Sequence, residues 1–410
     1  MKRRDLLLSS SALASLSAGC LRLTESSEGT STDPTGQSPA QAGSETGTGS
    51  DDDDEMGLTE SWTIERNIRL WNDVAATATG EGLLYFTTYS TEYENNGSVV
   101  AVDVQDGTTE WEYDKPAEVI FQLEYVDGQL YMLDADGALR VLDAATGTQN
   151  WASEVPYSSK SGDDEPLWPG NISVGPERVV VSLLDINSEE GYTYIYAVNK
   201  SEQRVDWEIQ HETIEEHSEY SYLSPEGLSP IVDGTVYVAF NRATISVDVQ
   251  DGTINWSQDN FPASGPVSVA DDVIVMPGGS FLQILDRASG DSLWSVEGTA
   301  PQGPSFISEP VIADGRVYAT ARDTEVYAVD LQGETTIWTG ETGGEIRVGP
   351  VVTDTAVWAG SRDGRVYAFE KESGAKLTSE LIGSPIVGFE YASGTLLLLT
   401  GESVGAFVTE

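Results

Sequence analysis

Short runs of apolar and β-branched residues alternate with polar turns from about residue 58 to the end of the chain. One kind of run is followed by Asp, a turn and then Trp, as in AVDVQDGTTEW (Ala101–Trp111). A second kind precedes it and starts at a turn, as in DGTVYVA from Asp233 and DGRVYAT from Asp314. A third kind, often introduced by Pro, precedes each pair, as in Gly265-Pro266-Val267. Short apolar runs separated by tight Asp-Gly turns are typical of antiparallel β-hairpins.

The Trp-containing unit recurs seven times, and its last copy has Thr378 where the others have Trp. The copies begin at Ala101, Val141, Ala197, Ser246, Ile284, Ala328 and Ala368. The run that precedes this unit occurs eight times, and one further Trp, Trp62, stands alone before the first copy. If the strand around Trp62 pairs with the C-terminal strand Val404–Val408, the ring closes without an open sheet edge. Division of residues 58–410 by eight gives about 44 residues per unit, the size of a four-stranded propeller blade. The sequence therefore predicts an all-β, eight-bladed β-propeller of four-stranded antiparallel blades over residues 58–410.

The Ala-x-Asp-x-x-x-Gly-x-x-x-Trp rhythm resembles the tryptophan-docking repeats of quinoprotein (PQQ-dependent) alcohol dehydrogenases. It is also similar to the PQQ-like repeats of the outer-membrane assembly lipoprotein BamB. The resemblance covers the whole propeller and implies that the tryptophans pack neighbouring blades together. These are Trp62, Trp111, Trp151, Trp207, Trp256, Trp294 and Trp338. Because the repeated residues serve packing, the resemblance indicates the fold more strongly than the function.

Two functions follow from this resemblance. A quinoprotein-type dehydrogenase would hold PQQ with calcium in the central funnel, and it remains the alternative. The body is shorter than such enzymes usually are, and the adjacent cysteines that typically stack on PQQ are absent, since Cys20 is the only Cys in the chain. No Cys-x-x-Cys-His haem site is present. We therefore expect no catalytic residue and no cofactor, and favour a non-catalytic binding or assembly scaffold.

The first twenty residues read as an export signal. Arg3 and Arg4 precede a short apolar stretch that ends at Ser17-Ala18-Gly19-Cys20. The arginine pair resembles a Tat signal, and the last four residues resemble a lipobox, in which Cys20 is lipidated. Residues 21–57 are rich in Ser, Thr, Gly and acids and predict a disordered tether. We expect an exported, extracellular lipoprotein on the outer face of the cytoplasmic membrane, held there only by its lipid anchor.

Charge narrows the choice of partners. The 410 residues include 68 Asp plus Glu and 21 Lys plus Arg, a formal net charge of −47. Such a surface repels phosphate backbones, which argues against nucleic acid. Acids spread through the whole chain resemble the composition of a halophilic protein. We expect a monomeric domain that binds an unknown protein or glycan at the cell envelope.

Long insertions predict where that partner binds. They fall between the second and third strands of blades (89–96 and 183–192) and at crossings between blades (156–170 and 210–226). In propellers these two loop classes share one face, so the insertions should gather on one rim over blades one to four. Long loops on a rigid scaffold often bind, and aromatic residues supply contact area there. The candidates are Tyr89, Tyr93, Tyr157, Trp168, Tyr192, Tyr220 and Tyr222.

The longest insertion contains both histidines of the chain, His211 and His217, together with Glu215. A divalent metal site there is a weak hypothesis, because the spacing matches no zinc helix, and we expect no metal. Four Asn-x-Ser sequons occur, at Asn96, Asn171, Asn199 and Asn255. Only Asn96 lies in an evident loop, so it is the candidate glycosylation site.

Overall fold

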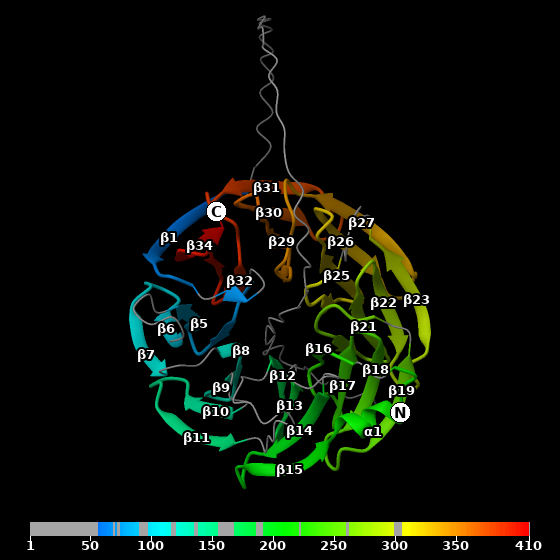
Figure 1. Ribbon diagram of the computed structural model, residues 1–410. Coiled ribbons are helices and arrows are strands. Elements are labelled where there is room, and N and C mark those ends of the chain that lie inside the picture. The colour runs from blue at the N-terminus through cyan, green and yellow to red at the C-terminus, as the bar shows by residue number, and fades with distance from the viewer. Residues whose placement is uncertain are drawn as a thin grey trace, which may run out of the picture.

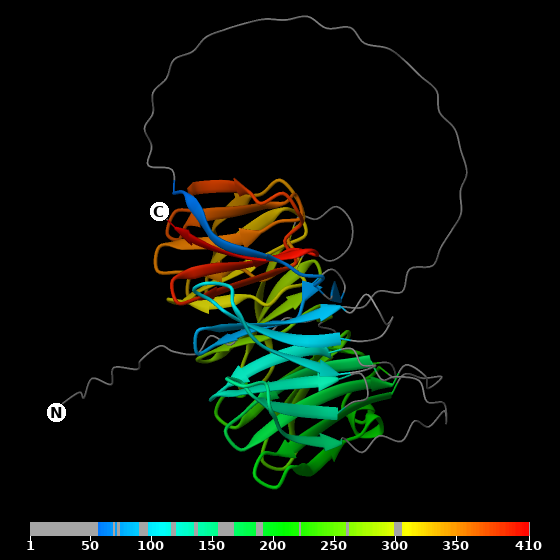
Figure 2. The same ribbon diagram turned by 90° about the vertical axis from the view of Figure 1, so that its left-hand side faces the viewer.

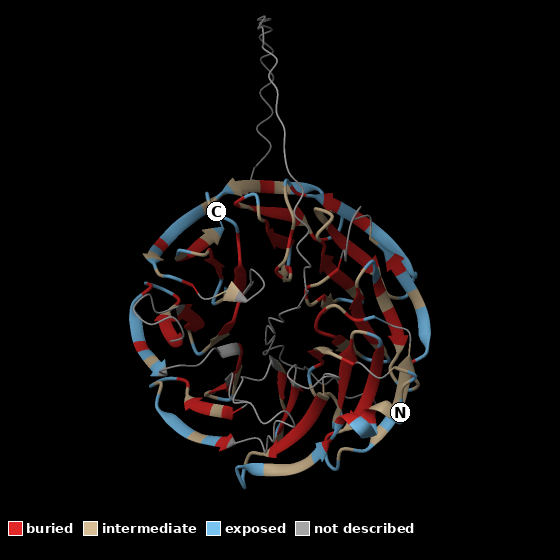
Figure 3. Cartoon of the chain, viewed as in Figure 1, coloured by how far each residue is buried: buried red, intermediate tan, exposed pale blue. Residues whose placement is uncertain are grey.

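The strands form a closed ring of eight blades around a central axis (Figure 1), which confirms the predicted propeller. The computed structural model describes residues 56–68, 70–71, 74–89, 97–115, 120–134, 138–154, 168–185, 192–220, 223–259, 262–298 and 306–409. Each blade is a four-stranded antiparallel sheet whose first strand lies near the axis and whose last strand lies on the outer rim. Buried residues fill the middle strands, whereas exposed residues concentrate on the rim (Figure 3).

Blades one to four follow each other in chain order, with strands listed from the axis outward. Blade one contains β4 (Thr77–Gly80), β5 (Leu83–Tyr89), β6 (Gly97–Asp103) and β7 (Thr109–Lys115). Blade two contains β8 (Ile120–Val126), β9 (Gln129–Asp134), β10 (Ala138–Asp143) and β11 (Gln149–Glu154). Blade three contains β12 (Trp168–Val174), β13 (Arg178–Asp185), β14 (Tyr192–Asn199) and β15 (Arg204–Ile209). Blade four contains β16 (Pro225–Leu228), β17 (Thr235–Phe240), β18 (Ala243–Asp248) and β19 (Ile254–Asp259).

The second half repeats this plan. Blade five contains β20 (Ser268–Ala270), β21 (Val273–Gly278), β22 (Phe281–Asp286) and β23 (Ser292–Glu297). Blade six contains β24 (Val311–Ala313), β25 (Arg316–Thr320), β26 (Glu325–Asp330) and β27 (Thr335–Glu341). Blade seven contains β28 (Val351–Val352), β29 (Ala356–Gly360), β30 (Arg365–Glu370) and β31 (Lys376–Leu381). Blade eight contains β32 (Gly388–Ala392), β33 (Thr395–Leu399), β34 (Ser403–Thr409) and β1 (Leu58–Glu65).

Blade eight joins the two ends of the described chain. Its outer strand β1 pairs antiparallel with β34, with Trp62 opposite Ala406 and Leu58 opposite Thr409. The predicted closure is therefore confirmed. The chain then crosses to blade one through a short hairpin of β2 (Leu70–Trp71) and β3 (Val74–Ala75).

An Asp, Glu or Asn at the end of the third strand shapes the turn to the fourth strand in blades one to seven. In blade one, Asp103 Oδ1 accepts the backbone N–H groups of Gln105 at 2.7 Å and Asp106 at 3.3 Å. Gly107 then takes a φ of 73°, a region that Gly enters without steric cost. In blade five the corresponding bonds from Ser289 lower the pKa of the Asp286 carboxyl. The side chain thus holds the turn, which is why the Asp-to-Gly spacing recurs.

Five tryptophans dock on the next blade at this same turn. Trp338 Nε1 donates to the Lys371 carbonyl at 3.1 Å, and a Cβ added to Gly374 would lie 2.5 Å from the indole. The other four indoles make the same bond, from Trp62 to Val104, Trp111 to Ala144, Trp207 to Val249 and Trp256 to Arg287. The glycine is therefore required for close approach of the ring as well as for its φ.

Two tryptophans meet a different turn. Trp151 and Trp294 face blades three and six, where Gln203 (φ 55°) and Glu334 (φ 51°) replace the glycine. Both indoles are partly buried against the neighbouring core cluster, and no hydrogen bond of their Nε1 is found among the described contacts. Thr378 occupies the Trp position that faces blade eight, where the third and fourth strands are β34 and β1 and no turn joins them. This explains the one missing tryptophan of the repeat.

Basic side chains at one repeat position reinforce three of these seams. Each of these basic residues directly follows the residue that accepts the turn hydrogen bonds. That residue is acidic in blades five and seven and is Asn199 in blade three. Lys371 Nζ contacts Asp314 Oδ2 of blade six at 2.7 Å, and Arg287 Nη2 contacts Asp233 Oδ2 of blade four at 2.9 Å. Lys200 lies 5.2 Å from the centre of the Tyr131 ring of blade two.

The antiparallel order gives the ring two unlike faces. Figure 2 views the ring from the side, and the strands of the nearer blades run from one face to the other. We call one the turn face, because it carries the short turns between first and second and between third and fourth strands. The other, the loop face, carries the loops between second and third strands and the crossings between blades. The single helix of the described residues, α1 (His211–Glu215), belongs to the crossing from blade three to blade four. No helix in the described part of the chain has the length and apolarity needed to span a bilayer.

Candidate functional site

The crossing that contains α1 is fixed to blade three by a buried histidine. His211 is 1% exposed, and its Nδ1 accepts the backbone N–H of Thr193 at 3.3 Å. Its Nε2 lies 3.5 Å from Glu215 Oε1, one helical turn later. The Tyr192 ring packs edge-on against the imidazole at 5.0 Å. An acceptor Nδ1 places the proton on Nε2, so His211 anchors the helix to β14.

His217 lies apart from this contact. Its side chain is exposed, and its backbone carbonyl accepts a hydrogen bond from Ser257 Oγ of blade four at 2.7 Å. The residues described contain no group of three or more His, Cys, Asp or Glu side chains arranged to hold a metal ion. His211, Glu215 and His217 thus serve the attachment of the crossing in this structure.

The segment after α1 lies against the outer strand of blade four. Asp259 accepts hydrogen bonds from Ser218 Oγ at 2.6 Å and from the Glu219 backbone N–H at 2.7 Å. The guanidinium of Arg242, in the loop between β17 and β18, stacks over the Tyr220 ring at 5.1 Å. Tyr220 also packs against the core cluster of blades three and four. Residues 210–220, which we call the ridge, are therefore held on blades three and four, and their exposed acids are Glu212, Glu216 and Glu219.

The structure places only some of the predicted partner residues. Tyr192 and Tyr220 are half-buried at this ridge, where they pack against His211 and Arg242. The backbones of Tyr89 and Trp168 belong to strands β5 and β12, and their side chains are not described. Five further predicted residues lie outside the described residues: Tyr93, Tyr157, Tyr222, Cys20 and Asn96. The predicted gathering of four insertions on one rim stays a prediction.

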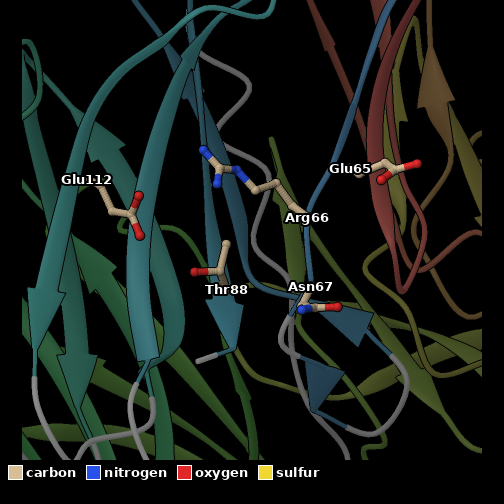
Figure 4. A pocket seen from close by; sticks show the side chains of 5 residues that line it. All are labelled: Glu65, Arg66, Asn67, Thr88 and Glu112. Atoms are coloured by element: carbon tan, nitrogen blue, oxygen red, sulfur yellow. The ribbon is translucent and has the colours of Figure 1, made fainter. Parts of the chain in front are cut away.

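A polar cleft of about 210 Å³ lies where the closing strand meets blade one (Figure 4). Its lining consists of Glu65, Arg66, Asn67, Thr88 and Glu112. Arg66 Nη2 donates to Thr109 Oγ1 at 3.2 Å and so ties the end of β1 to the outer strand of blade one. The sequence does not reveal this cleft, because its residues come together only when the ring closes. It is smaller than the usual pocket for a drug-sized ligand.

A second polar contact that the sequence did not reveal joins the inner strands of blades two and three. Gln122 Oε1 accepts the Ile172 N–H at 2.6 Å, and Glu124 Oε1 accepts the Val174 N–H at 3.2 Å. These side chains cover the free edge of β12. Glu124 is 6% exposed and its Oε2 has no hydrogen-bond partner among the described residues. Burial raises the pKa of Glu124 to about 7, against the lowering effects of the Val174 hydrogen bond and the Lys200 charge.

The described residues contain no cysteine and no group of three or more His, Cys, Asp or Glu side chains arranged to hold a metal ion. The absence of PQQ and calcium stays a prediction. The chemistry of the described residues provides hydrogen-bonding and charged surfaces on a rigid ring, which suits recognition.

Eight four-stranded blades with tryptophan-docking turns define the class as a β-propeller of PQQ-like repeats. The family model described as "Outer membrane protein assembly factor BamB" matches residues 59–296 and 176–380, so the chain belongs to this family. The protein of that name from Yersinia pestis is 24% identical over 233 residues, which cover 52% of this chain and 54% of the relative. The one from Xanthomonas campestris pv. campestris is 27% identical over 221 residues, 53% of this chain and 50% of the relative. The chain thus spans about half the length of the curated relatives that it matches.

Solved structures share the fold. BamB from Moraxella catarrhalis aligns with a TM-score of 0.60 at 16% identity, over 86% of this chain and all of that chain. Quinohemoprotein alcohol dehydrogenase from Comamonas testosteroni aligns with a TM-score of 0.69 at 15% identity, over 86% of this chain and 76% of that chain. At these identities the structures support the propeller and do not distinguish between scaffold and enzyme.

Proposed function

We propose that this protein is a non-catalytic binding and assembly scaffold for a protein partner at the cell envelope. Membership of the BamB family carries the proposal, because relatives of this family are named as outer membrane protein assembly factors. The closed ring supports it: its repeated residues pack blades together, and its variable residues lie in loops. Of the two classes of partner expected from the sequence, protein or glycan, the relatives favour protein.

The ridge around α1 is the part of the proposed surface for which contacts are described. Hydrogen bonds to Thr193 and Asp259 hold it on blades three and four, so a partner would meet a preorganised surface. Tyr192 and Tyr220 offer partly exposed rings beside the exposed acids Glu216 and Glu219. Aromatic rings with a polar surround are typical of binding hot spots.

Partner capture tests the proposal. The full-length protein and a variant with residues 156–170 and 210–226 shortened would be compared in affinity purification from its own membranes at high salt. We expect the variant to lose the principal protein partners. A matched control replaces Asp106 and Asp251, exposed residues on the turn face, by Asn and should keep them. Equal partner sets for all three proteins would contradict binding through this rim.

The alternative function, a PQQ-dependent dehydrogenase, is tested separately. Purified protein would be incubated with PQQ and calcium in high salt, desalted, and assayed for retained PQQ absorbance and for dye reduction with alcohols. We expect neither retention nor turnover. Retained PQQ together with alcohol-dependent turnover would overturn the scaffold proposal.

Anchoring is proposed on the sequence alone. Export through a Tat-like signal and lipidation of Cys20 would hold the propeller at the outer face of the cytoplasmic membrane. A Cys20→Ser variant should move from the membrane fraction to the soluble extracellular fraction, and mass spectrometry of the wild-type N-terminus should show the lipid. Membrane association that is unchanged in Cys20→Ser would contradict the anchor.

A further inference from the structure

Two arginines on the loop face converge on one carboxylate between blades six and seven. Arg347 donates from Nε and Nη2 to Glu345 Oε2 at 3.1 and 3.0 Å. Arg322 Nη2 lies 3.5 Å from the other oxygen, Glu345 Oε1. Arg322 comes from the loop between β25 and β26, whereas Glu345 and Arg347 come from the crossing between β27 and β28. In the described contacts of Glu345, two guanidinium groups thus meet one carboxylate.

The backbone around Glu345 is held tightly. The Arg362 N–H donates to the Glu345 carbonyl at 2.9 Å, and Ile346 forms a β-bridge with Ser361. The preceding glycines allow this approach, because a Cβ on Gly343 would lie 2.2 Å from Asp363 Oδ2. The crossing is therefore fixed on blade seven, and the carboxylate stands at a defined position between the two guanidinium groups.

Arg322 retains binding capacity. Its Nε is buried and has no hydrogen-bond acceptor among the described residues, and its one described ion pair is the long contact to Glu345. The side chains of Arg322 and Arg347 are each 22% exposed and that of Glu345 is 39% exposed, so solvent reaches the cluster. A guanidinium presents a planar fork of N–H donors, and a planar oxyanion that accepts two of them is its best partner. The neighbouring arginines also hold the pKa of Glu345 below its usual range, although burial alone would raise it.

We propose that Arg322 and Arg347 form a binding site for a carboxylate, and that Glu345 occupies this site as an internal competitor. An incoming carboxylate displaces Glu345 from Arg322 Nη2 and from Arg347. On a chain with a net charge of −47, anions are repelled almost everywhere, so a paired-arginine site selects where an acidic ligand docks. The site lies over blades six and seven and does not depend on the rim proposed for blades one to four.

If Glu345 competes with the ligand, its neutralisation should raise the affinity for a carboxylate, whereas loss of an arginine should lower it. Binding of two probes would be measured by calorimetry on the full-length protein: succinate, a free small carboxylate, and an acetylated, amidated peptide with two Glu residues, a protein-borne carboxylate. Glu345→Gln should raise the affinity about tenfold, because a charged competitor is lost. Arg322→Gln should lower it about tenfold. Arg316→Gln removes a comparable pair with Glu372 on the turn face and should change nothing.

The two probes also separate the sources of the ligand. Binding of succinate with both predicted shifts supports a small-molecule carboxylate, and binding of the peptide alone with the same shifts supports an acidic protein segment. Failure of both probes to bind, or an affinity that Glu345→Gln leaves unchanged or lowers, overturns the proposal. Since Glu345→Gln keeps the size of the side chain, it tests the site even if Arg322→Gln is unstable.

Discussion

Trp338 lies at the seam between blades six and seven, and Trp294 lies at the seam between blades five and six. The two residues occupy the same repeat position but pack differently. Trp338 is 7% exposed, lies on Gly374 and donates to the Lys371 carbonyl. Trp294 is less buried and meets a turn whose left-handed residue is Glu334, with a Cβ of its own. Both turns have a residue with positive φ at this repeat position, Gly374 in one and Glu334 in the other. The comparison indicates that the glycine lets the indole pack against the turn, and that a turn can form at this position without the glycine.

Removal of the two indoles should have unequal effects. Trp338→Ala should lower the free energy of unfolding by about 4 kcal/mol, from lost burial and the cavity left behind. Trp294→Ala should cost about half as much, because that ring is less buried and its N–H makes no described bond. Denaturant unfolding of both variants at one salt concentration measures this. An equal or larger loss for Trp294→Ala would break the comparison.

A methyl group on the docking glycine should be nearly as harmful. In Gly374→Ala the new Cβ would lie 2.5 Å from the indole and the residue would keep a φ of 72°. Overpacking and left-handed strain together predict a loss of about 3 kcal/mol. Glu334→Ala, at the same repeat position in blade six, is the control and should be nearly neutral. A neutral Gly374→Ala would show that the indole moves away at little cost.

The seam between blades two and three also lacks the glycine, and its buried Glu124 should make it sensitive to pH. The pKa of Glu124 is about 7 in the folded protein and 4.5 ordinarily, so the folded state binds more protons between these values. The stabilisation is therefore complete below about pH 4.5 and is lost as the pH rises through 7, by up to about 3 kcal/mol. Relative to Glu124→Gln, the unfolding free energy of the wild type should fall between pH 5 and pH 8. Parallel pH profiles of the two proteins would contradict this.

The smallest expected effect is a gain. Glu334→Gly should raise the free energy of unfolding by up to about 1 kcal/mol, because it relieves a left-handed non-glycine residue. Gln203→Gly should act alike in blade three. If the indole also docks, Trp294 fluorescence should shift to shorter wavelength in Glu334→Gly. A loss of stability in both variants would mean that the polar side chains hold these turns.

The repeat could be predicted almost completely from the sequence, because most copies have the same local hydrogen bonds and the same glycine. Asp at the third strand's end binds two backbone N–H groups of its own turn, and Gly takes the positive φ, both within six residues. Trp62, which stands before the first copy, and the C-terminal strand, which no Trp strand follows, then predict the closure. The pairing of β1 with β34 confirms it. The exception at Thr378 follows from the closure, because no turn joins β34 and β1 in blade eight.

The candidate sites could be predicted only in part. A histidine in an acidic loop gives no sign that its Nδ1 will accept the Thr193 N–H, because that contact spans 18 residues and depends on how α1 packs. Of the predicted aromatic rim, Tyr192 and Tyr220 turn partly inward. The arginine pair could not be predicted, because Arg322 lies in a loop of blade six, Arg347 lies in the crossing to blade seven, and neither stands in a motif.

The sequence by itself determined the number of blades, the turn at each repeat and the seam at which the ring closes, since these depend on spacing and local hydrogen bonds. Only the tertiary structure decided which polar side chains meet across seams: Gln122 and Glu124 on the edge of blade three, and Arg322 with Arg347 on Glu345. The physical reason is that the repeat specifies the strands and turns of each blade. These polar contacts between blades depend instead on side chains at positions that differ from one repeat to the next.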